Sequence, residues 1–169
     1  YMSQTIDDFN DFFKSSKEKK YFNIFNAIHD SLGLIKAQLE VNQIEVVINC
    51  QNEKIEQLGF VNEFRQVIIN IVHNAMIAIT NTERKRGLIK IELLFTSSHT
   101  TINICDNGGG IKGKNLDKIF NPYYTTKENG TGIGLHMSKV IIEEHMQGIL
   151  SVENYQNGSK FSIAFNHKE

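Results

Sequence analysis

The sequence has few of the features that would place it in a specialised class of protein. It contains two cysteines, one proline (Pro122) and no apolar run near the ~18 residues that a membrane-spanning helix needs. Neither Cys50 nor Cys105 has a metal-binding spacing, and both stand in apolar, strand-like stretches. We therefore expect buried free thiols in a reducing compartment. The net charge of -1 argues against a nucleic-acid or membrane surface as the main partner, and no signal-peptide pattern is present.

What remains is typical of a soluble globular domain. The 169 residues are 40% hydrophobic and 22% charged, enough to bury one core without disulfides. Apolar residues at helical spacing predict helices over 1–19, 21–39 and 61–80, with Asn23 as a cap, and a short helical turn over 116–120. Strands are expected over 44–50, 88–96, 100–105, 149–154 and 159–165, with a weak returning strand within 51–59. The strand pairs 88–96/100–105 and 149–154/159–165 are predicted antiparallel hairpins.

The helix over 61–80 carries two polar residues on an otherwise apolar background. Asn70 and Asn74 are one turn apart and share a face. A buried asparagine must be hydrogen-bonded to avoid a desolvation cost of about 1–3 kcal/mol, and a polar ligand or ion would satisfy that need. Two ordinary surface asparagines are an equally good interpretation of this segment taken alone.

A glycine-rich loop runs directly into the last predicted helix. Gly130, Gly132 and Gly134 permit positive φ and a close approach of the backbone to a ligand. The first amides of a helix lack internal partners and lie at its positive end, so this junction can bind phosphate. Because many helices begin in glycine-rich turns without any ligand, the pattern alone favours a plain turn.

A second glycine-rich segment follows a predicted strand. Asp106 stands at the strand end, and three glycines come after Asn107. A carboxylate there can accept a hydrogen bond from an exocyclic amine while a flat ring lies on the open backbone. The alternative is a glycine turn capped by aspartate. The irregular stretch 111–129 is long enough to predict a functional lid.

Four motifs in this order resemble the boxes of the sensor histidine kinase catalytic domain, which belongs to the GHKL group of ATP-binding proteins. They are Asn70-x-x-x-Asn74-Ala75, Asp106-x-Gly108-x-Gly110, Phe120-x-Pro122-x-x-Thr125-Thr126-Lys127 and Gly130-x-Gly132-x-Gly134-Leu135. The resemblance covers roughly Lys20 to the C-terminus. It implies an α+β fold, a two-layer α/β sandwich in which a mixed sheet of about five strands packs on three helices. It also implies that ATP binds between the asparagine helix and the glycine loop.

The resemblance assigns a role to individual residues. Asn74 matches the asparagine that binds Mg²⁺, and Asp106 matches the acid that recognises the adenine amino group. Lys127 is placed to reach a phosphate when the lid closes and, with Asn70, forms the expected catalytic pair, while Phe120 is expected to anchor the lid. The implied nucleotide-binding residues are Asn70, Asn74, Asp106, Gly108, Gly110, Ile111, Thr126, Lys127, Gly130, Thr131, Gly132, Gly134 and Leu135.

Two departures from the family pattern affect the expected chemistry. Many kinases carry a Lys-Tyr pair where this chain has Ile77-Ala78, so the basic contact is expected from Lys127 or Arg84. The hydrolysing relatives have a glutamate base at the position of Asn70. A neutral amide cannot take a proton from water near pH 7, which favours phosphoryl transfer over hydrolysis.

The phosphate acceptor is expected to lie outside this sequence. His29-Asp30 has a suitable dipeptide, but it falls within a predicted helix of the ATP-binding domain, so we interpret His29 as a surface histidine. His73 is expected to be a partly buried neighbour of the site. Residues 1–18 resemble the end of the second helix of a dimerisation hairpin, which leaves 19–169 as the catalytic domain and puts the acceptor before Tyr1.

The predicted function is transfer of the ATP γ-phosphoryl group to a histidine outside this chain. The expected partners are ATP, Mg²⁺, the dimerisation hairpin of the same protein and the receiver domain of a response regulator. We expect a cytoplasmic location, with the whole protein free or membrane anchored and no membrane contact by this part. Two alternatives stay open, an ATP-gated dimerisation module and a serine-kinase regulator of the same group.

Overall fold

The computed structural model describes residues 18–83, 86–128 and 130–167. Residues 1–17 of the expected hairpin segment, and with them nearly all of the helix predicted over 1–19, lie outside the described residues. Arg84, one of the two expected basic contacts, also lies outside them.

The fold is built on one mixed sheet. Its strands are β2 (Ile44–Cys50), β4 (Gly87–Phe95), β5 (His99–Asp106), β6 (Ile149–Tyr155) and β7 (Gly158–Asn166). They lie in the order β2-β4-β5-β7-β6, with β2 and β4 parallel and every other neighbouring pair antiparallel. This arrangement confirms the predicted sheet of five strands and both predicted hairpins.

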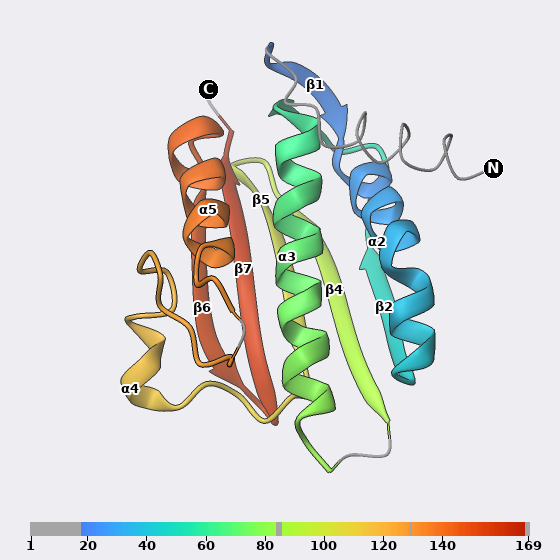
Figure 1. Cartoon of the computed structure of the whole chain (residues 1–169). Coiled ribbons are helices and arrows are strands. Elements are labelled where there is room, and N and C mark those ends of the chain that lie inside the picture. The colour runs from blue at the N-terminus through green and yellow to red at the C-terminus, as the bar shows by residue number, and fades with distance from the viewer. Residues whose placement is uncertain (1–17, 84–85, 129, 168–169) are drawn as a thin grey trace, which may run out of the picture.

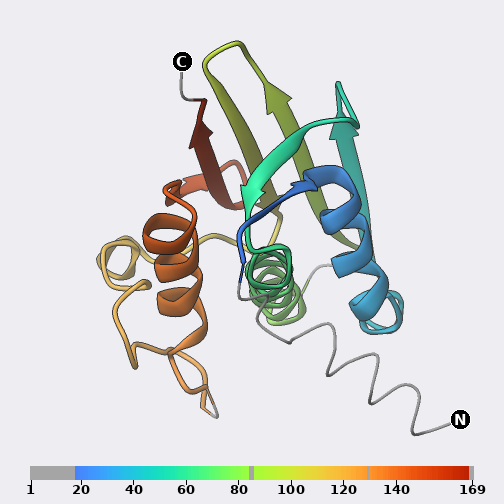
Figure 2. The same cartoon turned by 90° about the horizontal axis from the view of Figure 1, so that it is seen from above.

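Three helices cover one face of the sheet. α2 (Ile24–Val41), α3 (Val61–Thr80) and α5 (Gly134–Val140) lie side by side, with α3 in the middle (Figure 1). Viewed from above, the sheet and the helices form two layers (Figure 2). α5 continues into a π-helical turn, Ile141–His145. The expected α+β two-layer sandwich is therefore confirmed.

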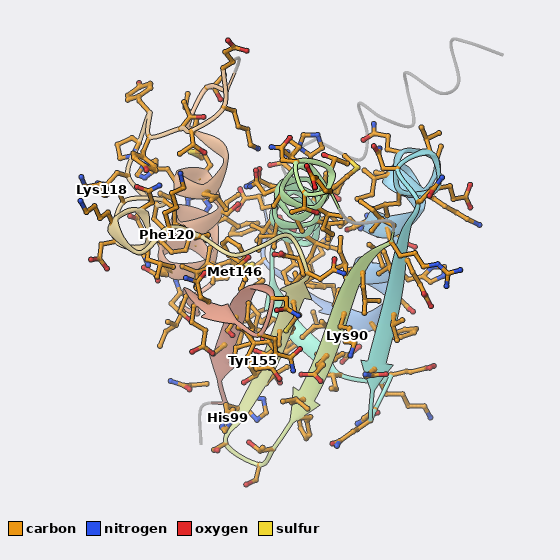
Figure 3. All side chains as sticks on the ribbon, turned by 90° about the horizontal axis from the view of Figure 1, so that it is seen from below. Lys90, His99, Lys118, Phe120, Met146 and Tyr155 are labelled. Atoms are coloured by element: carbon orange, nitrogen blue, oxygen red, sulfur yellow. The ribbon has the colours of Figure 1, made fainter. Side chains whose placement is uncertain are left out.

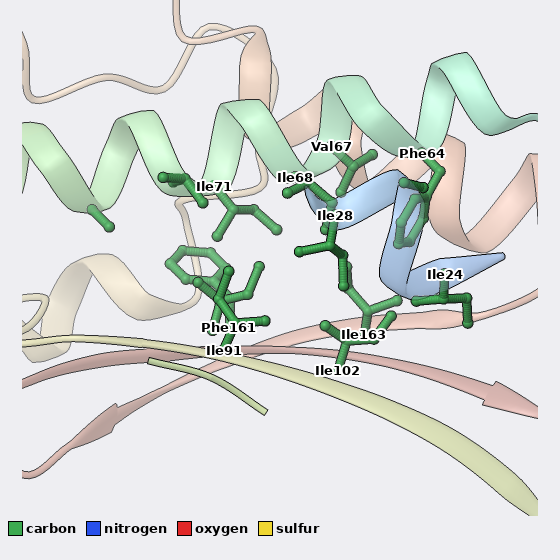
Figure 4. Close-up of a cluster of buried hydrophobic side chains, with 14 of the residues drawn as sticks. Ile24, Ile28, Phe64, Val67, Ile68, Ile71, Ile91, Ile102, Phe161 and Ile163 are labelled. Carbon is green, nitrogen blue, oxygen red and sulfur yellow. The ribbon is translucent and has the colours of Figure 1, made fainter. Parts of the chain in front are cut away.

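The hydrophobic core fills the space between the helices and the sheet. Figure 4 shows Phe64, Val67, Ile68 and Ile71 of α3 pointing toward strand residues that include Ile102. Eight residues of α3 are buried: Phe64, Val67, Ile68, Ile71, Val72, Ala75, Met76 and Ile79. This wide apolar surface is what a helix packed between two others and a sheet requires. α3 is accordingly the rigid element on which a site can be built.

The predicted start of the second helix, at residue 21, was wrong, because a short strand precedes the helix. Lys20–Asn23 forms β1, which pairs antiparallel with β3 (Glu56–Gly59), and α2 begins only at Ile24. Phe22 is buried while Tyr21 is 70% exposed, the alternation of a strand. The weak strand expected within 51–59 is confirmed as β3, although its partner is β1. Asn23 does cap α2, since its side-chain oxygen accepts a 2.8 Å hydrogen bond from the amide of Asn26.

Two smaller expectations were also wrong. The irregular stretch 111–129, called the long loop below, contains a short helix, α4 (Gly113–Leu116). This helix lies earlier than the predicted 116–120, because Ile119 and Phe120 turn inward and pack on the core. Cys50 and Cys105 are both free thiols, but they are half buried and not fully buried as expected. For Cys105 the reason is strand alternation, which places it on the sheet face away from the helices. Within the described ranges, none of the helices has the length and apolar character needed to cross a membrane.

Candidate functional site

Three side chains on one face of α3 each meet a different predicted motif. They are spaced four residues apart, so the helix presents them in a row. The contacts pair Asn70 with Gly134, Asn74 with Lys127, and Ala78 with Gly108. Motifs that are separated by up to about sixty residues in the sequence therefore converge on one stripe of α3.

Asn70 connects α3 to the first turn of α5. Its Nδ2 donates a 2.9 Å hydrogen bond to Oγ of the buried Ser138, and that hydroxyl donates a 3.0 Å bond to the carbonyl oxygen of Gly134. A Cβ atom at Gly134 would lie 2.5 Å from Oδ1 of Asn70, so a side chain there would force one of the two to shift. The Nδ2 group of Asn70 is thus bound by the protein, and its Oδ1 atom lies against the start of α5.

Asn74 binds the lysine of the long loop. Nζ of Lys127 donates a 2.5 Å hydrogen bond to Oδ1 of Asn74. Burial lowers the pKa of Lys127, because a desolvated ammonium group loses its hydration. The pKa of His73 is lowered chiefly by partial desolvation and further by the charge of Lys127, although the imidazole keeps an exposed surface. A cation therefore already lies on the oxygen that was expected to bind a metal ion.

Asp106 ends β5 as a buried carboxylate held by the protein. Oδ1 accepts a 2.7 Å hydrogen bond from the amide of Gly108 and a 3.4 Å bond from that of Ser159. Oδ2 accepts a 2.5 Å bond from the hydroxyl of Ser159. An ionised carboxylate has about four acceptor positions, so one remains for a ligand amine. A Cβ atom at Gly108 would lie 2.7 Å from Cβ of Ala78, and the glycine therefore lets this segment lie close to α3.

The long loop is anchored at Phe120. Its ring lies 6.4 Å from that of Phe161 in an edge-on arrangement, and Nζ of Lys139 lies 4.7 Å from its centroid. Nδ1 of His136 is 3.1 Å from the Phe120 carbonyl oxygen. Figure 3 shows Phe120 and Lys118 on this loop, beside α5. These contacts agree with the expected anchor, and they tie the loop to the sheet and to α5.

The glycine loop folds back on the segment before it. The amide of Gly130 donates a 3.2 Å hydrogen bond to the carbonyl of Lys127, and Gly132 has φ +67°. Side-chain atoms at Gly132 would collide with the backbone of Tyr123 and Tyr124. The other expected members of this loop are placed as follows: Thr126 and Thr131 are exposed, and Leu135 is half buried against the core.

Sequence reasoning missed the residues that hold the predicted ones in place. Ser138 orients Asn70, Ser159 binds Asp106, and Ala78 lets Gly108 approach. The small side chain at 78 was noted only as a departure from the family pattern. Ser138 and Ser159 gave no signal, because a single serine in a helix or strand has no diagnostic pattern.

A hollow of about 500 Å³ lies on the other side of the loop, between Phe120, Pro122, His136 and Leu150. None of the α3 asparagines lines it, and Asp106 does not either. The hollow is therefore separate from the site formed where the motifs meet on α3.

Comparison with known proteins identifies the family. Residues 59–169 match the family described as "Histidine kinase-, DNA gyrase B-, and HSP90-like ATPase". The chain belongs to this family. The match begins just before α3 and includes every motif that meets the α3 stripe, so the resemblance found in the sequence is confirmed.

The relatives of this chain include proteins named as a sporulation kinase and a two-component sensor. Sporulation kinase A of Bacillus subtilis is 32% identical over 151 residues, covering 89% of this chain and 24% of that protein. The two-component sensor PprA of Pseudomonas aeruginosa is 31% identical over 155 residues, covering 89% of this chain and 17% of that protein. The catalytic domain of histidine kinase ThkA, in a nucleotide-free form, superposes with a TM-score of 0.80 at 29% identity, covering 88% of this chain and 95% of the solved one. This ATPase-family chain thus spans about a quarter or less of those two curated relatives.

The donor set at Asn74 suits a magnesium ion that is carried by a nucleotide. Within the described ranges, no group of three histidine, cysteine or acidic side chains is placed to hold a metal ion. Mg²⁺ keeps several waters and substrate phosphates as ligands, so one amide oxygen is an adequate protein contribution. That oxygen accepts a hydrogen bond from the ammonium group of Lys127 in this structure.

Proposed function

We propose that this chain is the ATP-binding catalytic domain of a two-component sensor histidine kinase. The observation that carries the proposal is the α3 stripe, on which Asn70, Asn74 and Ala78 meet the three other motifs. Asn70 and Ala78, the ends of the stripe, are eight positions apart, about 12 Å along the helix. This length separates an adenine end, at Asp106, from a phosphate end, at Gly134.

At the adenine end, Asp106 accepts a hydrogen bond from the exocyclic amine of the base. Its carboxylate is already fixed by Gly108 and Ser159, so little orientational freedom is lost on binding. Gly108 and Gly110 let the backbone beside Asp106 lie close to Ala78 and Asn154, which holds this segment in place for the base.

At the phosphate end, the amides of Thr131, Gly132 and Gly134 bind the phosphates. The amide of Gly130 joins them once it leaves the Lys127 carbonyl. Lys127 supplies a positive charge, and it leaves Asn74 to do so, which exposes the Asn74 oxygen. Mg²⁺ bound there with the phosphates would neutralise part of their charge.

The chemical step transfers the γ-phosphoryl group to a ring nitrogen of a histidine outside this chain, and ADP leaves. The residues here act by positioning and by electrostatic stabilisation, as is general for phosphoryl transfer. Asn70 supplies no base for water, because its Nδ2 is bound to Ser138 and an amide does not accept a proton near pH 7. Transfer is accordingly favoured over hydrolysis.

The partners follow from this function. Residues 1–18 belong to the dimerisation hairpin of the same protein, which presents the acceptor histidine to domain 19–169. The receiver domain of a response regulator takes the phosphoryl group from that histidine. The reaction takes place in the cytoplasm, where ATP is available.

Nucleotide binding tests the proposal directly. We would measure ATP affinity by calorimetry, with and without Mg²⁺, for the unsubstituted chain, Asp106→Asn and Asn74→Ala. Asp106→Asn should lower ATP affinity in both conditions, and Asn74→Ala should remove most of the Mg²⁺ dependence. Asp117→Asn and Asn49→Ala are matched controls, since both side chains are exposed outside the α3 stripe. Unchanged affinity in both test variants would contradict the proposal.

A transfer assay tests the acceptor. The chain would be supplied with ATP and a separate dimerisation hairpin carrying the acceptor histidine. Acid-labile, alkali-stable phosphate on the hairpin is the expected product. Acid-stable phosphoserine would support the serine-kinase alternative instead.

A further inference from the structure

Asn154, on the edge strand β6, binds the backbone of one residue at two points. The amide of Ile111 donates a 2.7 Å hydrogen bond to Oδ1 of Asn154, and Nδ2 of Asn154 donates a 2.7 Å bond to the carbonyl oxygen of Ile111. The two residues are 43 positions apart in the sequence. A side-chain amide bound in this way satisfies the donor and the acceptor of Ile111 much as a neighbouring strand would.

The residues before Ile111 are held by the same hairpin. The amide of Gly109 donates a 2.8 Å hydrogen bond to the carbonyl of Asn157, in the turn between β6 and β7. Gly110 has φ +79°, and a Cβ atom there would lie 2.9 Å from Oδ1 of Asn154. Glycine at 110 is therefore required both by the backbone conformation and by the approach of Asn154.

Ile111 occupies the junction between two parts of the site. The segment that begins at Asp106 ends here, and the rest of the long loop, which is anchored at Phe120, starts with Lys112. Asn154 thus binds both polar groups of the residue that lies between the segment beside Asp106 and the loop beyond Lys112.

We propose that Asn154 is a positioning residue for adenine recognition. It fixes Gly109–Ile111 as a rigid floor for the base and separates that floor from the moving loop. The inference rests on the proposed function, since it names how the same site holds its base. The side chain of Asn154 is exposed and its two hydrogen bonds go to the backbone of Ile111, so it acts through Ile111 and contributes little to the core.

Three variants separate positioning from simple packing. Asn154→Ala removes both hydrogen bonds. Asn154→Asp has nearly the same shape but cannot donate to the Ile111 carbonyl, so a positioning role predicts a defect and a space-filling role predicts none. Asn103→Ala is the matched control, because Asn103 accepts a 2.7 Å hydrogen bond from Ser162 between β5 and β7 and does not contact residues 106–111.

The first measurement needs no nucleotide. Hydrogen exchange of the Ile111 amide, followed by NMR, should be about tenfold faster in Asn154→Ala, as expected for the loss of a net hydrogen bond. Asn103→Ala should leave this rate unchanged. An unchanged rate in Asn154→Ala would overturn the inference.

The second measurement compares ATP with inorganic tripolyphosphate, which has no base. Both Asn154 variants should bind ATP about tenfold more weakly and tripolyphosphate unchanged, because only the base contacts the floor. Equal weakening for both ligands, or full ATP affinity in Asn154→Asp, would overturn the inference and leave the proposed function standing. If the unsubstituted chain bound no ATP, the proposed function would fail and this inference with it.

Discussion

Nζ of Lys127 lies 2.5 Å from Oδ1 of Asn74, so a cation from the long loop is bound to the helix oxygen that is proposed to bind Mg²⁺. The two residues are 53 positions apart in the sequence. The contact links the loop to α3, and the proposed binding of Mg²⁺ at Asn74 requires that it break.

Removing the lysine charge should loosen the loop in the nucleotide-free protein. In Lys127→Met the loop loses its hydrogen bond to Asn74, and amide exchange across residues 121–128 should rise by about tenfold, the effect of one net hydrogen bond. Exchange measured by mass spectrometry checks this. Lys118→Met is the control, since Lys118 lies on the same loop and is exposed. Equal exchange in the two variants would mean that the contact does not hold the loop.

A methyl group at position 134 should disrupt the phosphate end of the site. In Gly134→Ala the new Cβ atom would lie 2.5 Å from Oδ1 of Asn70, so either the Asn70 amide or the start of α5 must move. We expect ATP affinity to fall by at least about tenfold, a loss of 1.4 kcal/mol. Gly113→Ala should bind ATP normally, because no atom lies within 4 Å of that Cβ position. Similar affinities in both variants would contradict this account of Gly134.

Truncating the centre of the core should destabilise the whole domain. Phe64 of α3 is fully buried and its ring lies 5.2 Å from that of Phe22. Phe64→Ala should lower the free energy of unfolding by about 3–5 kcal/mol, which urea titration measures. Tyr21→Ala, at a side chain that is 70% exposed, should change it by less than about 0.5 kcal/mol. A loss below 1 kcal/mol in Phe64→Ala would show that α3 is not central to the core.

The reactivity of Cys105 should depend on pH in a defined direction. Burial raises the pKa of the Cys105 thiol, and the charges of Glu92 and Asp106 raise it further, while Lys160 and Lys90 act in the opposite sense. Less thiolate is therefore present near pH 8 than at an ordinary cysteine, and alkylation is slower. Glu92→Gln removes a raising charge, so the midpoint of the alkylation rate against pH should move to lower pH. Iodoacetamide labelling of the Cys105 peptide measures this midpoint, and a shift to higher pH would contradict the assignment.

Local patterns were sufficient to predict most of the secondary structure. The period of apolar residues located α3 and all five strands of the main sheet closely, and polar turns indicated both hairpins. The exception at Lys20–Asn23 has a clear cause. This segment has apolar residues at a spacing that also fits a helix, and it becomes a strand only because β3 pairs with it.

Local patterns likewise named some residues of the proposed site and missed others. The motifs named the residues that would face a nucleotide, because glycines and a strand-end aspartate have a recognisable local chemistry. The residues that orient them are remote in the chain: Ser138 is 68 positions from Asn70, and Ser159 is 53 positions from Asp106. A serine becomes informative only when the fold shows what its hydroxyl contacts.

The sequence by itself determined the family, the order of the motifs and the kinds of elements, because these depend on residue type and short-range spacing. Only the tertiary structure decided that Lys127 lies on Asn74, that Ser138 and Ser159 hold Asn70 and Asp106, and that Asn154 binds Ile111. Each of those contacts joins segments brought together by packing around α3 or by strand pairing in the sheet. Such long-range pairings depend on the whole folded core rather than on any local pattern.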